Sequence, residues 1–152
     1  MADVQLSSHP VDIGLRSETT ILAALVELGY DVLVPWGFNR RYDYVIDLGR
    51  EVIRAQCKTG RLRDGLVLFP TMSVRVNTQG AHRRSYRGEV DVFLVHCPQT
   101  KGTYVVPVVA SGPQTGQLRV SPTRNGQAKR IRWARDHLIA EGSVARALLP
   151  PR

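Results

Sequence analysis

Residues 41–58 read RYDYVIDLGREVIRAQCK, and this stretch decides the fold of the chain. Apolar and polar side chains alternate over residues 42–48 and again over residues 51–58, which is the pattern of two strands in a sheet. The Gly49-Arg50 pair between them suits a two-residue turn with glycine at its first position. The stretch therefore predicts a β-hairpin.

The length of the turn fixes which residues of the hairpin face one another. With Leu48 opposite Glu51, Asp43 is expected directly opposite Gln56. Lys58 lies two residues beyond Gln56, so its side chain is expected on the same face as the other two. A carboxylate, an amide and an ammonium group would then share one side of the hairpin. The other side is expected to be core and carries Tyr42, Tyr44, Ile46, Leu48, Ile53, Ala55 and Cys57.

Around the hairpin, the order of helical and strand patterns predicts one domain over residues 1–152, an α/β or α+β fold with a mixed sheet. A first helix is expected to begin at Ser17 as its N-cap and to end at Gly29. Further strands are expected at residues 31–35, 66–70, 73–76, 90–96 and 103–109, loops at 77–88 and 112–116, and helices at 127–139 and 143–149.

Glu18 is an acidic residue on the apolar stripe of the first helix, because it precedes Ile21, Leu22 and Leu25 by three, four and seven positions. A carboxylate buried there without a partner would be costly. A place in the first turn, favoured by the helix dipole, would account for it. The alternative is that Glu18 points at the polar residues of the hairpin and shares a cation with Asp43.

The charge of the chain points to a polyanionic partner. The formal net charge is +8, and the basic excess lies in residues 61–152, whereas residues 1–60 are slightly acidic. Most of the cations are arginines, which bind phosphate in a bidentate manner. Nucleic acid is the simplest such partner, although a basic surface also serves solubility.

Other features exclude several classes of protein. No apolar stretch is long enough to cross a membrane, and the first eight residues lack the pattern of a secretory signal. Cys57 and Cys97 are not in a CxxC motif, which favours a reducing cytoplasm without disulfides. There is no P-loop, GxGxxG or GxSxG motif. No zinc-ligand spacing links the histidines, which are His9, His82, His96 and His137.

Glu18 on its helix, Asp43 in its strand and the Gln56-Cys57-Lys58 segment together resemble the PD-(D/E)xK nuclease superfamily. The resemblance is strongest to the small homing endonucleases that carry QxK in place of (D/E)xK, and it extends more weakly to about residue 110. It implies a restriction-endonuclease-like core, in which helices flank a mixed sheet. It also implies a metal-dependent endonuclease that cuts double-stranded DNA at specific sites and acts as a dimer or tetramer.

The same resemblance implies roles for four residues. Glu18, Asp43 and Gln56 would be ligands of Mg²⁺, with Mn²⁺ as an alternative ion, and Lys58 would be the catalytic lysine of the motif. Oxygen ligands of this kind suit a hard divalent cation. Gln56 stands where relatives have a second acid, so two carboxylates rather than three would hold the ion. A register shifted by one residue would put Asp47 in the place of Asp43.

A nuclease site would make the basic residues around it DNA contacts. Trp36 and Trp133 could stack on bases or pack in the core or an interface. The alternatives are a Holliday junction resolvase with the same core, a non-catalytic DNA-binding module, and an RNA-binding protein that shares only the basic charge. The expected DNA contacts are Arg40, Arg41, Arg61, Arg75, Arg83, Arg84 and Arg87.

Overall fold

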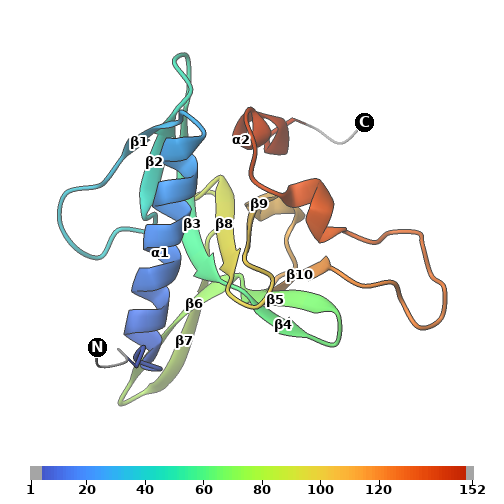
Figure 1. Cartoon of the computed structure of the whole chain (residues 1–152). Coiled ribbons are helices and arrows are strands. Elements are labelled where there is room, and N and C mark those ends of the chain that lie inside the picture. Colours follow the sequence, from blue (N-terminus) through green and yellow to red (C-terminus); the bar gives the residue numbers. More distant parts are fainter. Residues whose placement is uncertain (1–4, 150–152) are drawn as a thin grey trace.

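A computed structural model of the chain describes residues 5–149 (Figure 1). The predictions on the first residues of the chain and on Pro150-Pro151 lie outside the described residues. The helices are α1 (Pro10–Glu27) and α2 (Ser143–Ala147), with 3₁₀ turns η1 (Val108–Ala110) and η2 (Ala134–His137). The strands are β1 (Asp31–Leu33), β2 (Tyr44–Asp47), β3 (Val52–Thr59), β4 (Arg61–Arg63), β5 (Leu66–Pro70), β6 (Met72–Asn77), β7 (Gly80–Ser85), β8 (Val92–Cys97), β9 (Gly102–Pro107) and β10 (Thr115–Arg119).

A mixed central sheet confirms the predicted α/β architecture. Its strand order is β1-β2-β3-β8-β9, in which β3 and β8 run parallel and the other neighbours antiparallel. Helix α1 runs across this sheet and contacts β1, β3 and β8 (Figure 1). Strands β10, β5 and β4 form a second sheet, and β6 and β7 form a separate two-stranded hairpin. None of the helices within residues 5–149 has the length and hydrophobicity needed to span a membrane.

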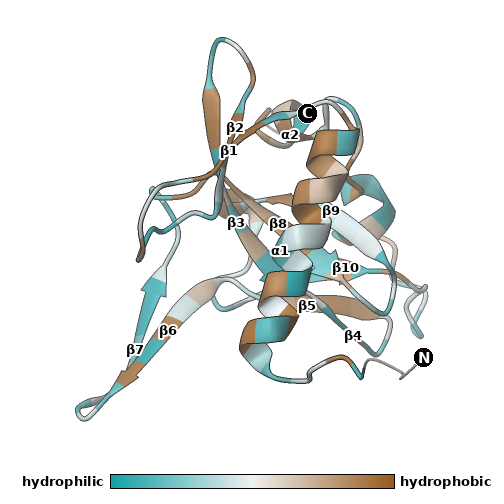
Figure 2. Cartoon of the chain, turned by 60° about the vertical axis from the view of Figure 1, so that its left-hand side comes forward, coloured by the Kyte–Doolittle hydropathy of each residue, from teal (hydrophilic) through white to brown (hydrophobic). Residues whose placement is uncertain are grey.

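Buried side chains form a core cluster on each face of the central sheet. Along β8, Val92 and Leu94 belong to the cluster under α1, whereas Phe93 and Val95 belong to the cluster that includes β5 and β10. This alternation follows from the geometry of a strand, whose successive side chains point to opposite faces. A strand buried on both faces is expected for the parallel part of a sheet. No residue of the β6–β7 hairpin belongs to either cluster, and its strand β7 is hydrophilic (Figure 2).

The register of the β2–β3 hairpin is the predicted one. The ladder pairs Asp47 with Val52 and Tyr44 with Ala55. Asp47 is exposed, and its Oδ1 accepts the Gly49 N–H at 2.7 Å, so it belongs to the turn and does not take the place of Asp43. The predicted core side chains Tyr44, Ile46, Ile53, Ala55 and Cys57 are buried, whereas Tyr42 and Leu48 are half-buried.

The predicted pairing of Asp43 with Gln56 falls one position beyond the end of the ladder. The ladder ends at Tyr44, and the Asp43 N–H donates to the Ala55 carbonyl at 2.9 Å. The Asp43 side chain accepts the Cys57 N–H through Oδ2 at 2.8 Å. Asp43 is therefore joined to β3 through its carboxylate.

The first helix begins earlier than predicted. Its N-cap is His9, whose Nδ1 accepts the Val11 N–H at 3.3 Å, and Pro10 occupies the first helical position, where proline is favoured. Ser17 is not a cap but lies in the middle of the helix, where it is only 2% exposed and its hydroxyl bonds Thr59 Oγ1 at 2.6 Å. Glu18 is thus beyond the first turn, and the helix dipole does not account for its position.

Three other predicted elements differ. The loop expected at 77–88 contains β7 instead. The sequence did not predict this strand because every residue of it is exposed, so it shows no apolar face. The helix expected at 127–139 is reduced to the 3₁₀ turn η2. Gly126 and Arg130 have positive φ angles of 67° and 60°, which break a helix, and the basic residues from Lys129 onward would repel one another on adjacent turns. The loop expected at 112–116 overlaps the start of β10.

Candidate functional site

Asp43 lies immediately before β2 and is half-buried. Its Oδ2 accepts the backbone N–H of Cys57, the residue between Gln56 and Lys58 on β3. This bond fixes the carboxylate against the segment that carries the other two predicted site residues. The arrangement comes directly from the hairpin register, because a shift by one residue would remove it.

Glu18 reaches the same place from α1. The Tyr44 hydroxyl donates to the Glu18 backbone carbonyl at 3.1 Å, which ties this turn of the helix to β2. The Glu18 side chain is half-buried, and the nearby negative charge of Asp43 adds to the effect of burial in raising its pKa. The structure therefore brings the helical carboxylate and the strand carboxylate together.

Burial is the main cause of the unusual electrostatics of this pair. It raises the pKa of Asp43, while the Cys57 N–H and the positive charge of Lys58 act in the opposite direction. Burial and the two carboxylates also raise the pKa of the Cys57 thiol. Neither carboxylate forms an ion pair within residues 5–149, where the ion pairs are Arg41–Glu89, Arg54–Asp91, Arg63–Asp64 and Arg84–Glu89. A site of this kind favours a cation.

Gln56 adds an uncharged oxygen to the set. It is half-buried, and its Nε2 donates a long hydrogen bond of 3.5 Å to the Cys57 carbonyl. Two carboxylates and an amide are oxygen donors of the type that Mg²⁺ prefers. The described residues contain no group of three or more His, Cys, Asp and Glu side chains arranged to hold a metal, so the amide is needed to complete a three-residue set. The residues present fit a hard divalent cation.

Lys58 is held by an aromatic residue that the sequence did not single out for the site. Its Nζ donates to the Tyr86 hydroxyl at 3.1 Å and lies 4.4 Å from the centre of the Tyr86 ring. The Arg41 guanidinium also lies over this ring, at 4.1 Å from its centre. Tyr86 is buried and packs edge-to-face on Phe93, with ring centres 5.6 Å apart.

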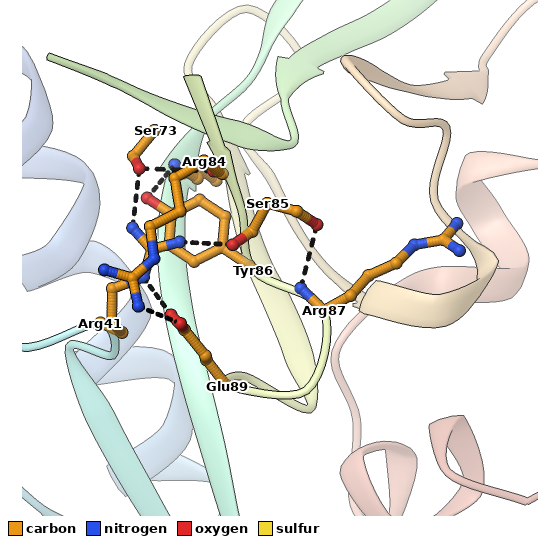
Figure 3. A network of polar contacts seen from close by, with 8 residues as sticks. Arg41, Ser73, Arg84, Ser85, Tyr86, Arg87 and Glu89 are labelled. Atoms are coloured by element: carbon orange, nitrogen blue, oxygen red, sulfur yellow. Dashed lines mark hydrogen bonds and ion pairs between the residues drawn. The ribbon is translucent and has the colours of Figure 1, made fainter. Parts of the chain in front are cut away.

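Arg41 joins the site to the base of the β6–β7 hairpin (Figure 3). It forms an ion pair with Glu89 and donates to Ser73 Oγ at 2.7 Å and to the Ser85 carbonyl at 2.6 Å. Arg84 forms an ion pair with the same Glu89 carboxylate. Both arginines therefore have partners inside the protein, and their contact with DNA remains a prediction.

The other predicted DNA contacts are exposed and come from several elements. Arg75 and Arg83 lie on β6 and β7, Arg61 on β4, and Arg40 in the segment before β2. Arg87 is exposed and its guanidinium lies 3.5 Å from the Ser111 carbonyl. Of the two tryptophans, Trp36 is 95% exposed, whereas Trp133 is half-buried with the Arg135 guanidinium over its ring.

Comparison with known proteins identifies a family and similar solved structures. A family model described as PD-(D/E)XK endonuclease matches residues 8–140. The structure of a bacterial homing endonuclease, I-Ssp6803I, is similar with a TM-score of 0.69 at 21% sequence identity, over 87% of this chain and 89% of that chain. This similarity confirms the predicted restriction-endonuclease-like fold. None of the curated proteins matches the chain.

Proposed function

The chain belongs to the PD-(D/E)XK endonuclease family, and on this premise we propose that it is a divalent-metal-dependent, site-specific endonuclease of double-stranded DNA. The homing type of activity is supported by the similar structure, which is that of a bacterial homing endonuclease. The basic surface, with a net charge of +8, suits a polyanionic substrate.

The observation that carries the proposal is the pair of half-buried carboxylates next to Lys58. Glu18, Asp43 and Gln56 would hold the ion, with Mg²⁺ as the expected cation and Mn²⁺ as a substitute. Such a cation would neutralise negative charge on the phosphate and lower the pKa of the water bound to it. Glu18 from α1 and Asp43 from the position just before β2 would hold it.

Lys58 would act on the phosphodiester itself. Its ammonium group can offset the negative charge that develops on the phosphate, or orient the attacking water. The protein already holds this group at the Tyr86 hydroxyl, 3.1 Å away, beside Asp43. The carboxylates would thus bind the cation, and the lysine would stabilise negative charge on the substrate.

Cleavage of both strands requires more than one copy of the chain. One such site cuts one strand, so we propose a homodimer or tetramer whose symmetry matches that of its DNA site. Exposed arginines on the β6–β7 hairpin would contact phosphates on either side of the cut.

Cleavage of a random-sequence DNA library with Mg²⁺, followed by sequencing of the new ends, tests this function. We expect cuts enriched at one recognition sequence and abolished by a chelator. Four-way junctions offered beside linear duplex separate the alternatives, because preferential cutting of junctions would replace the homing-type activity with that of a resolvase. Absence of cation-dependent cleavage of any DNA would contradict the proposal.

A further inference from the structure

The segment between β1 and β2 exposes two large aromatic side chains to solvent. In this aromatic loop, residues 34–40, Trp36 and Phe38 are each 95% exposed. Gly37 and Asn39 have positive φ angles of 92° and 60°, so the backbone between and after the two rings adopts a conformation that favours glycine and asparagine. Neighbouring aromatic side chains with almost no burial mark a binding surface.

The aromatic loop leads directly into the candidate site. Arg41 follows the loop directly and is fixed through Ser73 and the Ser85 carbonyl at the base of the β6–β7 hairpin. Asp43, two residues later, is fixed through the Cys57 N–H. The loop and the hairpin project from the same side of the molecule, on the left of Figure 2. A substrate that reaches Asp43 from this side meets both.

Charge favours a nucleic acid over an apolar protein surface as the occupant. Residues 32–42 contain two arginines, Arg40 and Arg41, and no acidic residue. Bases offer flat π-faces for stacking on aromatic side chains, and phosphates pair with the adjacent arginines. Architectural DNA-binding proteins also insert apolar side chains between base steps in this way.

We propose that Trp36 and Phe38 stack on DNA bases next to the cleaved phosphodiester, which gives the nuclease a base-contacting element besides its phosphate contacts. The inference rests on the proposed function. Loss of both rings is expected to weaken DNA binding by about tenfold or more, since stacking of one base on an aromatic side chain commonly contributes that much.

Tryptophan fluorescence tests this contact in the whole 152-residue chain. The chain has two tryptophans, so the Trp133→Phe variant reports Trp36 alone, and the Trp36→Phe variant reports Trp133 alone. A short fluorescein-labelled DNA duplex is titrated in the presence of a chelator, which prevents cleavage. We expect DNA to quench Trp36 but not the half-buried Trp133, and the Trp36→Ala/Phe38→Ala variant to bind the same duplex more weakly.

Each alternative outcome has a defined meaning. If the wild type binds the duplex while Trp36 is not quenched and the double variant keeps its affinity, the base contact is overturned. Sedimentation analysis of the double variant would then show whether the rings instead join copies of the chain, as a shift to smaller oligomers. If the wild type binds no DNA, the proposed function fails and this inference fails with it.

A different observation, the stack around Tyr86, carries a second inference. The ring of the buried Tyr86 contacts both Lys58 and Arg41, and its hydroxyl accepts a hydrogen bond from the Lys58 ammonium group. Arg41 is in turn fixed by Glu89, Ser73 and the Ser85 carbonyl (Figure 3). Lys58 therefore has one defined hydrogen-bond acceptor on a side chain that packing and ion pairs hold in place.

The geometry points to Tyr86 as a positioning residue for Lys58, an inference that also rests on the proposed function. Tyr86→Phe removes the hydroxyl but keeps the ring that packs on Phe93 and under Arg41. We expect kcat to fall about tenfold, which corresponds to the loss of one hydrogen bond to a charged group, with KM and DNA affinity unchanged.

The Lys58→Ala variant separates the positioning role of Tyr86 from the catalytic role proposed for Lys58. Wild-type kcat in Tyr86→Phe, together with an inactive Lys58→Ala, would overturn the positioning role and leave the proposed function intact. A fall in thermal midpoint with no change in kcat would make the hydroxyl structural, which also overturns it. Wild-type turnover in Lys58→Ala would remove the lysine from the proposed chemistry.

Discussion

At the residue scale, Glu18 and Asp43 are two like charges that the fold keeps partly away from water. Burial raises the pKa of both, and the charge of Asp43 raises that of Glu18 further. Between its ordinary pKa and its raised pKa, such a carboxyl group binds more protons in the folded state than in the unfolded state. Stability is therefore lost as pH rises through this window, and the loss persists at neutral pH.

The Glu18→Gln variant is expected to be more stable than the wild type at neutral pH, because the amide removes an ionised group that the fold disfavours. The difference should shrink as pH falls below the ordinary pKa of a glutamate, where Glu18 is neutral in both states. Thermal midpoints measured across this pH range check the prediction. A variant less stable than the wild type at neutral pH would show that Glu18 has a favourable partner in the folded protein.

In the wild type, divalent cations should offset the loss of folding stability that the ionised Glu18 and Asp43 cause. Binding to the folded state alone raises the thermal midpoint, and the rise grows with cation concentration. We expect Mg²⁺ and Mn²⁺ to stabilise the wild type and to have a much smaller effect on Asp43→Asn. Asparagine can still accept the Cys57 N–H, so the control variant keeps the local structure. Equal shifts in the two proteins would place the bound cation elsewhere.

At the element scale, the β2–β3 hairpin could be predicted from the sequence because turn length and alternation act over a few residues. Its register places Asp43 next to Gln56 and Lys58. The start of α1 could not be placed from its apolar stripe, since the decisive signal is Pro10 after His9, seven residues before the expected cap. The arginine-rich segment from residue 127 shows the limit of helical spacing, because spacing takes no account of like-charge repulsion or of positive φ angles.

The β6–β7 hairpin gives a prediction that concerns DNA affinity rather than catalysis. Arg75 and Arg83 are exposed, and no ion pair holds them within the described residues. Replacing both by alanine should weaken binding across DNA sequences and flatten the dependence of log affinity on log salt by roughly one unit per lost phosphate contact.

Arg146→Ala on α2 is the matched control for the hairpin, because Arg146 is also exposed and no DNA contact is predicted for it. Its salt dependence should equal that of the wild type. A salt dependence unchanged in the hairpin variant as well would mean that the β6–β7 hairpin faces away from DNA.

At the scale of the whole molecule, the parts of the site that the sequence did not predict come from non-local pairing. The parallel pairing of β3 with β8 brings the Tyr86–Glu89 turn beside Lys58. Local patterns do not determine which strands become neighbours in a sheet. Glu18 could be linked to Asp43 because an acid on an apolar stripe requires a partner, whereas nothing in the local pattern distinguishes Tyr86 from an ordinary core tyrosine.

The assembly is also a property at this scale. Because one site cuts one strand, double-strand cleavage predicts that the protein is a dimer or tetramer. Light scattering on the purified chain, with and without DNA, measures its mass. A monomer under both conditions would limit the activity to nicking and would contradict the proposed double-strand cut.

Nicking of supercoiled plasmid DNA tests the central claim most directly, because it requires only one strand to be cut and no knowledge of the target sequence if the plasmid carries a random library. We predict Mg²⁺-dependent nicking by the wild type and none by Asp43→Asn or Lys58→Ala, with both variants folded and still bound to DNA. Wild-type nicking rates in either folded variant would contradict the claim that Glu18, Asp43, Gln56 and Lys58 form one nuclease centre.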